Sequence, residues 1–480
     1  MSAAQSNAKP EDRPQDKPEE KPEEKPEDKP EDKPEDKPED KPEDKPQDKL
    51  VDKLKALECH FTWGLKYSRA SLLRLRDKLE DIGTEEGNGW LGHIYNLQGY
   101  IHHQLGFNDD ARSFFSKAAE AFSRIRNAES DEGPWLVVNF GNKAWLHYSL
   151  GEHAETRVCL SRVDELMRAY PSPSEEELHP EICAEKAWTL MKFGPEKKLL
   201  AADYFQKAIR MQPEMVEWQT SHVLTSVSKF KHSSTGPDDD IMVEMRNAIE
   251  QDPENLFLAV LYAEQRGKKG EDVQDEIQEL ARKVLVNPVS SYSGIKILLR
   301  AYAYYLSFEE AINLAEEVLQ KHPDERYLKR CEALCYKWKI IYDRNNPPNQ
   351  KMINRAIELH KEVISLYPDS CLVKEIDLAD ISAKSPRSLA TADQMYQELL
   401  RRRNLQPEDK QLLYNRYGKY LNYDQHEYSN SIRYHMKAAE IMIKSFHRDN
   451  SISILQRIRD RGRNRMHREI EGFLARLQPL

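Results

Sequence analysis

The sequence contains 480 residues, of which 39% are hydrophobic and 32% are charged, and it carries a net charge of −10. Only 18 glycines and 9% aromatic residues argue against collagen-like and prion-like proteins. Residues 1–49 hold 11 basic and 18 acidic residues and thus seven of the ten net negative charges. The acidic balance therefore does not argue against nucleic-acid binding by residues 50–480.

Cysteine content and hydropathy indicate the cellular compartment. Six cysteines in so long a chain are too sparse for a disulfide scaffold. The N-terminus lacks an apolar signal core, and no uncharged apolar run approaches the roughly 20 residues that span a bilayer. These features predict a reduced, soluble, cytoplasmic protein with no membrane partner.

The first 49 residues are dominated by a Lys-Pro-Glu-Asp tetrapeptide that repeats with small variations from Lys17 to Asp48. Proline at every fourth position removes backbone donors and biases the preceding lysine toward extended conformations. Nothing in this stretch can be buried, so we expect a disordered tail with polyproline-like bias. The alternative is a tail that acts as a spacer or docking arm.

Residues 50–480 show apolar residues at helical spacing and almost no strand-like alternation. Two windows have the spacing of a tetratricopeptide (TPR) helix pair, in which small residues let two helices cross closely and a phenylalanine fills the gap. Weaker copies begin at Ala311 and Ala356. The two windows are Gly99, Gly106, Ala111, Phe115, Ala118 and Ala201, Phe205, Ala208, Pro213.

Helix-ending prolines recur near the TPR period of about 34 residues. The gaps between them are 40, 35, 35 and 45 residues, so two fit closely and two accommodate loop insertions. We therefore predict an all-α chain in which residues 50–480 form one superhelical array of TPR-like helix pairs, an α-solenoid whose concave face binds extended ligands. The prolines are Pro213, Pro253, Pro288, Pro323 and Pro368.

Two otherwise apolar stretches contain isolated basic residues. From Val289 to Leu306 the only charges are Lys296 and Arg300, which lie four residues apart and so share one helix face. Between Ala187 and Gly194 the only charge is Lys192. Because an uncompensated buried charge is costly, these residues either pair with acids on neighbouring helices or line a groove that receives an anion. Two such sites in one array favour the groove.

Arginine is concentrated near the C-terminus, with a smaller cluster at residues 401–403. So dense a run suits phosphate contacts, which are independent of sequence and sensitive to salt. The alternative is a solvated terminal helix. The arginines of the run are Arg457, Arg459, Arg461, Arg463, Arg465 and Arg468.

Motifs for catalysis and for metal binding are missing from the sequence. Cys331 and Cys335 share a helix face, but no nearby histidine or cysteine completes a zinc set, so buried packing is favoured. There is no glycine-rich phosphate loop, GxSxG elbow or GxGxxG fingerprint. We expect a binding protein that is not an enzyme and needs no cofactor or metal.

Four groups of residues match motifs of one known family. They are Cys59-His60-Phe61-Thr62-Trp63; Leu136-Val137, Gly141-Asn142 and Ala144-Trp145; Pro180-Glu181-Ile182 with Glu185, Trp188, Leu190 and Lys192; and Leu334-Cys335-Tyr336-Lys337. With these motifs the chain resembles the interferon-induced proteins with tetratricopeptide repeats, the IFIT family. The resemblance covers residues 50–480.

The resemblance implies a TPR superhelix that encloses a basic tunnel and acts in innate antiviral defence. The tunnel captures the 5′ end of single-stranded RNA, which is a triphosphate or a cap lacking 2′-O-methylation. Further partners are copies of the chain or related TPR proteins. The RNA-binding positions it implies are Lys192, Lys296 and Arg300 for phosphates, Trp188 for the cap, Phe257 and Leu224 for the pocket, Lys78 in an early loop, and Lys229 beside Ser228, where the family has an arginine.

The main rival is a TPR scaffold for protein partners. TPR grooves often hold peptides, and the same lysines could clamp a peptide carboxylate. RNA binding through many phosphates depends steeply on salt, whereas a single carboxylate clamp depends on it much less.

Overall fold

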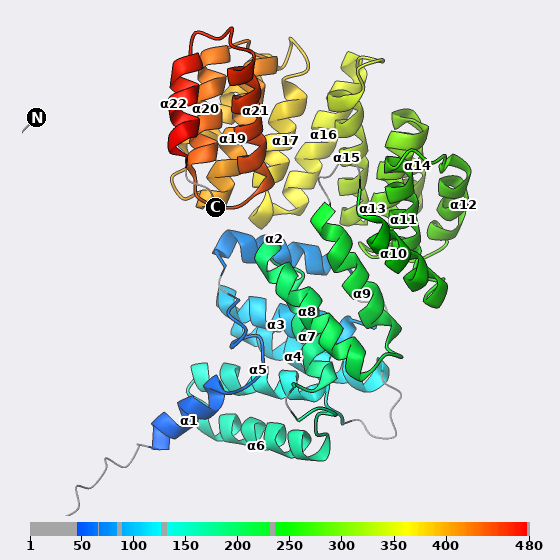
Figure 1. The fold of residues 1–480 in the computed structure, drawn as a ribbon, viewed down its shortest axis with the longest axis vertical. Coiled ribbons are helices and arrows are strands. Elements are labelled where there is room, and N and C mark those ends of the chain that lie inside the picture. The colour runs from blue at the N-terminus through cyan, green and yellow to red at the C-terminus, as the bar shows by residue number, and fades with distance from the viewer. Residues whose placement is uncertain are drawn as a thin grey trace, which may run out of the picture. The chain divides into compact units, whose positions relative to one another are not determined.

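The computed structural model describes residues 46–65, 67–83, 89–125, 132–175, 177–230 and 236–477. These residues contain helices and no β-strand, so the predicted all-α class is confirmed (Figure 1). Residues 50–480 group into one compact unit. The predicted tail lies outside the described residues except at its end, where the first helix begins at Pro46.

The helices in the first half of the chain are α1 (Pro46–Lys55), α2 (Arg69–Glu80), α3 (Leu91–Leu105), α4 (Asn108–Ile125), α5 (Leu136–Ser149), α6 (His153–Ala169), α7 (Pro180–Leu190), α8 (Pro195–Met211), α9 (Val216–Val227), the 3-10 turn η1 (Ser228–Phe230), α10 (Asp239–Gln251) and α11 (Leu256–Lys268). Those in the second half are α12 (Gln274–Val284), α13 (Ile295–Ala301), the π-helical turn η2 (Tyr302–Leu306), α14 (Phe308–Lys321), α15 (Arg326–Tyr342), α16 (Gln350–Leu366), the 3-10 turn η3 (Pro368–Ser370), α17 (Leu372–Ser382), α18 (Leu389–Arg401), α19 (Pro407–Tyr423), α20 (Tyr428–Glu440), α21 (Phe446–Asp460) and α22 (His467–Arg476).

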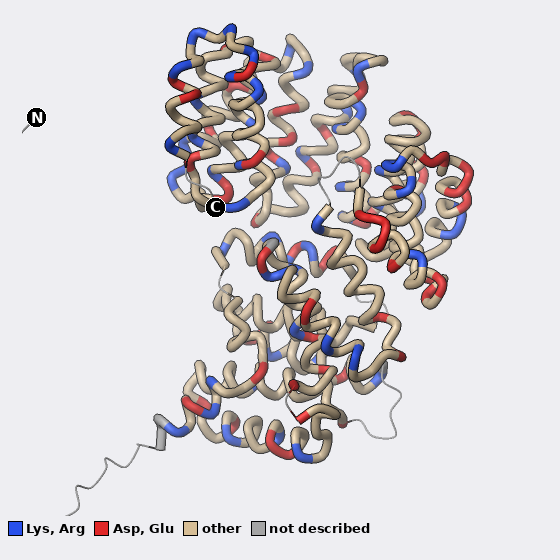
Figure 2. Tube along the Cα trace, in the orientation of Figure 1, with Lys and Arg blue, Asp and Glu red and all other residues tan. Residues whose placement is uncertain are grey.

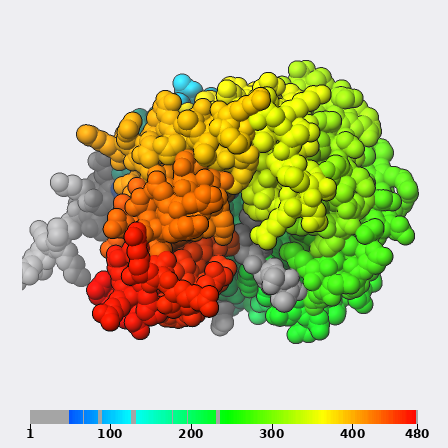
Figure 3. All heavy atoms as spheres, turned by 90° about the horizontal axis from the view of Figure 1, so that it is seen from above, coloured from blue at the N-terminus to red at the C-terminus, as the bar shows by residue number. Residues whose placement is uncertain are grey.

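Helices that are neighbours in sequence pack against each other, as in α3 with α4, α5 with α6, α7 with α8 and α19 with α20. Buried apolar side chains form successive clusters along the chain, two of which span residues 256–381 and 432–470. Seen from above, the segments from α9 onward follow one another in an arc (Figure 3). This serial packing of helix pairs is that of a TPR-like solenoid, and the predicted architecture is confirmed.

The predicted TPR window at residue 99 forms the α3–α4 pair. Gly99 lies so close to Phe115 that an ideal Cβ atom on Gly99 would lie 2.5 Å from the ring. Phe115 and Ala118 are fully buried. Gly106 follows the end of α3 with φ +91°, a backbone conformation that favours glycine. The small residues and the phenylalanine therefore play the packing roles expected from their spacing.

The five predicted helix-ending prolines all follow helices. Pro213, Pro253, Pro323 and Pro368 each lie two residues after the last residue of a helix, namely α8, α10, α14 and α16. Pro288 lies four residues after α12. Because proline lacks a backbone donor, it marks these helix ends in the sequence.

Helix α2 is tied to segments far along the chain. The carboxylate of Asp81, just after α2, accepts hydrogen bonds from Arg326 at 3.1 Å, Arg330 at 3.0 Å and the Tyr367 hydroxyl at 2.8 Å. Asp77 accepts another from the Ser370 hydroxyl. We call these six residues the α2 clasp. It joins the N-terminal helices to α15 and η3.

None of the helices that the structure describes has the length and apolar character to cross a lipid bilayer.

Replacing Gly99 by alanine should lower the thermal midpoint of unfolding by a few degrees, because the new methyl group must displace the Phe115 ring. Overpacking of this kind costs about 1–3 kcal/mol. Gly472 of α22 is the matched control, since a Cβ atom there has no heavy atom within 4 Å. Gly472→Ala should leave the midpoint unchanged or raise it slightly. Equal effects of the two variants would contradict the close α3–α4 contact.

Replacing Asp81 by alanine should destabilise the fold by about 1–3 kcal/mol, because the half-buried Arg330 and the buried Tyr367 hydroxyl lose this acceptor, while Arg326 keeps Glu80. Hydrogen exchange of the α2 amides, followed by mass spectrometry, should accelerate. The control is Asp369→Ala, which removes an ion pair to Arg76 from a side chain that is 53% exposed and should cost about 0–1 kcal/mol. Unchanged exchange in α2 after Asp81→Ala would refute the clasp.

Candidate functional site

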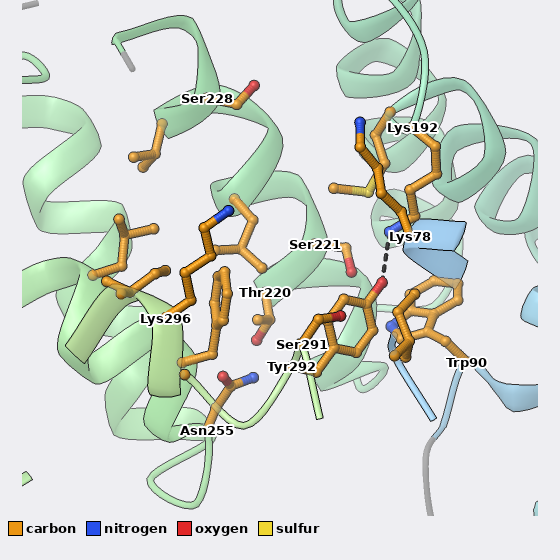
Figure 4. Close-up of a pocket in the computed structure, with 18 of the residues that line it drawn as sticks. Lys78, Trp90, Lys192, Thr220, Ser221, Ser228, Asn255, Ser291, Tyr292 and Lys296 are labelled. Carbon is orange, nitrogen blue, oxygen red and sulfur yellow. Dashed lines mark hydrogen bonds between the residues drawn. The ribbon is translucent and has the colours of Figure 1, made fainter. Parts of the chain in front are cut away.

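A cavity of about 770 Å³ lies between α2, α7, α9, α11, α13 and α15 (Figure 4). Basic and acidic residues are interspersed along most of the helices (Figure 2), but basic residues dominate this wall by seven to three. A surplus of positive charge in a cleft favours an anionic ligand. The basic residues are Lys78, Lys192, Lys198, Lys268, Lys296, Arg300 and Arg330, and the acidic ones are Asp81, Glu217 and Asp252.

Lys192 is placed in the cavity by the end of α7. Proline at the first position of α7 and the His179 side chain, which accepts a hydrogen bond from the Glu181 amide at 3.2 Å, define its start. The helix ends at Leu190, and the Lys192 amide then bonds to the Thr189 carbonyl at 3.0 Å. The lysine therefore sits on a tight turn rather than on a helix face.

The Lys192 ammonium is surrounded by aromatic side chains. Its Nζ atom donates to the Tyr292 hydroxyl at 2.6 Å and lies 4.1 Å from the centre of the Trp188 ring (Figure 4). Among the described residues, no carboxylate lies within ion-pairing distance of Nζ. Burial, aided by the charge of Lys198, lowers the pKa of Lys192 to about 7. An incoming anion would supply the missing countercharge.

Helix α13 brings Lys296 and Arg300 to the same cavity, as their spacing predicted. Gly294 before it has φ +87°, and a Cβ atom there would lie 3.2 Å from the backbone of Phe257 in α11. Arg300 pairs with Glu264 of α11 at 2.5 Å. The alternative of an acid on a neighbouring helix is therefore correct for Arg300, although this residue still lines the cavity.

The aromatic and aliphatic positions implied by the resemblance also meet here. Trp188, Phe257 and Leu224 line the cavity. Trp188 is only 1% exposed and stacks on Trp90, with ring centres 5.8 Å apart. Its indole therefore has little free surface in this structure.

One expected residue lies elsewhere. Lys229 is exposed in η1 and does not line the cavity, whereas its neighbour Ser228 does. Adjacent residues of a tight turn point in different directions, so a shift of one residue does not bring the lysine inward. Lys198 lies at this wall instead and donates to the Ser228 hydroxyl at 3.3 Å. The expected charge beside Ser228 thus comes from α8.

The sequence analysis did not single out Lys198, Lys268 or Tyr292 as site residues. Lys198 stands in a charged first turn of α8 and Lys268 at the charged end of α11, where lysines are ordinary. Tyr292 lies within the apolar stretch that drew attention to Lys296. Its position four residues before Lys296 in the sequence was the only indication that Tyr292 could be a site residue.

A second cavity of about 250 Å³ adjoins the first and shares Lys78, Lys296 and Arg330 with it. Arg74 and Lys374 add positive charge. The Lys374 ammonium donates to the Ser370 carbonyl at 2.9 Å, and burial lowers its pKa to about 8. The basic surface therefore continues from the main cavity along α2 and α15.

The C-terminal arginine run lies outside both cavities. Arg459 bonds to the adjacent Asp460 at 2.9 Å, and Arg465 bonds to the Ser429 hydroxyl at 2.6 Å. These contacts fit the alternative of solvated terminal helices. Cys331 and Cys335 are buried, as expected from packing. No group of three side chains suited to a metal occurs among the described residues.

Comparison with known proteins identifies relatives along most of the chain, although no family profile matches it. The human antiviral innate immune response effector IFIT1 is 26% identical over 449 residues, which are 88% of this chain and 91% of the relative. Human interferon-induced protein with tetratricopeptide repeats 2 is 26% identical over 418 residues, or 84% of this chain and 86% of the relative.

Solved structures of human IFIT1 share the fold. The dimer with m7Gppp-AAAA matches with a TM-score of 0.66 at 25% identity, covering 88% of this chain and 94% of that one. The dimer with PPP-AAAA matches with a TM-score of 0.63 at 25% identity over the same shares of both chains. The similarity thus extends over nearly the whole described helical array.

Lys192 should titrate near pH 7 in the free protein. With lysine labelled by ¹³C at Cε, its NMR signal, assigned through Lys192→Arg, should shift with a midpoint near 7. Inorganic triphosphate should raise that midpoint, because a nearby anion favours the ammonium form. Above the midpoint the unfolded chain holds a proton that the folded chain lacks, so this residue makes the free energy of unfolding rise with pH up to about 10. A midpoint above pH 9 would contradict the burial argument.

Proposed function

Because the chain belongs to the family of interferon-induced proteins with tetratricopeptide repeats, we propose that its main cavity binds the 5′ end of single-stranded RNA in innate antiviral defence. The ligand is a triphosphate or an incompletely methylated cap. The observation on which the proposal rests is the half-buried Lys192 side chain, whose ammonium has a hydroxyl rather than a carboxylate as its hydrogen-bond partner. The human relative IFIT1 is an antiviral effector whose solved structures contain both kinds of RNA end.

A 5′-triphosphate suits the charge of the cavity. It concentrates several negative charges, which lysine meets as a point charge and arginine as a bidentate fork. Lys192, Lys198 and Lys296 line one cavity, so one phosphate chain can contact more than one of them. Binding there compensates an ammonium group that burial otherwise disfavours.

The remaining wall suits single-stranded RNA without regard to sequence. Phe257, Tyr292 and Tyr327 line the cavity, and stacking of a base on an aromatic ring contributes about 1–3 kcal/mol whatever the base. Stacking on such rings requires unpaired bases, so this cavity suits a single strand better than a duplex. The second cavity, with Lys374, extends the cationic surface for following phosphates.

The proposal describes a binding protein rather than an enzyme, working in the cytoplasm. The cysteines in the described part of the chain are free thiols, which fits a reducing compartment. Human IFIT1 has been solved as a dimer with RNA, and we include association with copies of the chain or with related TPR proteins. Residues 1–45, which precede α1, are proposed to form a disordered extension.

The decisive experiment compares binding of one RNA oligomer with a 5′-triphosphate or a 5′-hydroxyl to wild type and to Lys192→Ala. The wild type should prefer the triphosphate. Loss of a charge-assisted contact worth about 1.5–3 kcal/mol should weaken triphosphate binding about tenfold to a hundredfold. Fluorescence anisotropy at several salt concentrations would measure both affinity and its salt dependence.

Lys229→Ala is the matched control, because it removes an exposed lysine outside the cavity. It should change the affinity less than Lys192→Ala does. Equal binding of both RNA ends by the wild type, with weak dependence on salt, would favour the peptide-binding scaffold. If Lys192→Ala still prefers the triphosphate, another cation of the cavity must bind the phosphates.

A further inference from the structure

The loop between α12 and α13 is held firmly where it enters the cavity. The Ser291 amide donates to the Asp81 carbonyl at 2.8 Å, which ties the loop to the end of α2. The Ser290 hydroxyl, in a side chain that is nearly buried, accepts from the amides of Tyr292 at 3.2 Å and Ser293 at 3.1 Å. The backbone of Tyr292 is therefore fixed by neighbours on both sides.

From this loop the Tyr292 side chain reaches across the cavity to Lys192 (Figure 4). Its hydroxyl accepts the 2.6 Å hydrogen bond from Nζ, and its ring centre lies 5.2 Å from the same atom. Burial raises the pKa of Tyr292 above the ordinary tyrosine value. The phenol therefore stays neutral and leaves the positive charge of Lys192 available to a phosphate.

The wall behind Lys192 is already filled by aromatic rings. Trp188 has Nζ of Lys192 over its ring at 4.1 Å and Trp90 stacked on it at 5.8 Å, and only 1% of its surface is exposed. A base could stack on this indole only after Lys192, Tyr292 or Trp90 had moved. A phosphate, by contrast, needs only the ammonium and nearby donors.

We propose that this cavity selects an uncapped 5′-triphosphate over a capped end, and that Tyr292 is the specificity-determining residue. The proposal rests on the proposed function. A triphosphate that meets Lys192 presents any further nucleoside to the wall formed by Tyr292, Trp188 and Trp90. A terminal phosphate ends before that wall, whereas the guanosine of a cap must displace an anchored tyrosine to find a stacking surface.

The proposal concerns a ratio of affinities rather than the affinity for either end. Removal of the Tyr292 ring would expose one side of the Lys192 and Trp188 site and give a guanine base room to stack. Removal of the hydroxyl alone would break the hydrogen bond to Lys192 but leave the ring in place. Tyr292→Ala therefore tests the space that the ring fills, and Tyr292→Phe tests the hydrogen bond of the hydroxyl.

The test measures dissociation constants of one RNA sequence with a 5′-triphosphate, an unmethylated Gppp cap or a 5′-hydroxyl. For the wild type, the triphosphate should bind at least about tenfold more tightly than the capped RNA. Tyr292→Ala should bring the ratio of the two constants close to one, whereas Tyr292→Phe should retain most of the preference. Far-UV circular dichroism and thermal unfolding would check that both variants are folded.

Each outcome has one meaning. Equal wild-type affinity for triphosphate and capped RNA, with weaker binding of the hydroxyl end, would overturn the selection and keep the proposed function. A triphosphate preference unchanged in Tyr292→Ala would overturn the role of Tyr292. If the wild type bound neither phosphorylated end better than the hydroxyl end, the proposed function itself would fail. If Tyr292→Ala does not fold, the triphosphate-to-cap affinity ratios of the wild type and of Tyr292→Phe still test the proposal. Loss of the triphosphate preference in Tyr292→Phe, which keeps the ring, would contradict a role for the ring.

Discussion

The carboxylate of Asp81 joins parts of the chain that lie about 250 residues apart. It accepts hydrogen bonds from Arg326, Arg330 and Tyr367, while its own backbone carbonyl accepts one from Ser291. A solenoid packs mainly between neighbours in sequence and has no inherent reason to close on itself. This one buried acid holds α2 against α15 and positions the loop before α13. The walls of the main cavity depend on that closure.

The cations of the cavity differ in how their charge is compensated. Arg300 has Glu264, and Arg330 has Asp81, so much of their charge is balanced within the protein. Lys192 has a neutral hydroxyl and the faces of two aromatic rings. Because desolvation disfavours an uncompensated ammonium, Lys192 gains more from an anionic ligand than these two arginines do. The paired arginines instead hold the wall and contribute a weaker field.

Much of the fold could be predicted because its determinants are local. Prolines mark helix ends wherever they occur, and small residues spaced for a helix crossing act within one helix pair, as Gly99 and Phe115 do. The isolated charges Lys192, Lys296 and Arg300 could be found because an apolar neighbourhood makes a charge conspicuous. The resemblance to family motifs added Trp188, Phe257, Leu224 and Lys78, all of which line the cavity.

The sequence alone determined the helical class, the repeat architecture and the isolated cations, since each follows from spacing along one or two adjacent helices. Only the tertiary structure decided which charges are paired and which side chains share a wall. Lys198 rather than Lys229 approaches Ser228, and Tyr292 meets Lys192 across a separation of 100 residues. Such contacts depend on the angles at which successive helix pairs pack along the whole array. A local sequence pattern does not determine the sum of these many small angles.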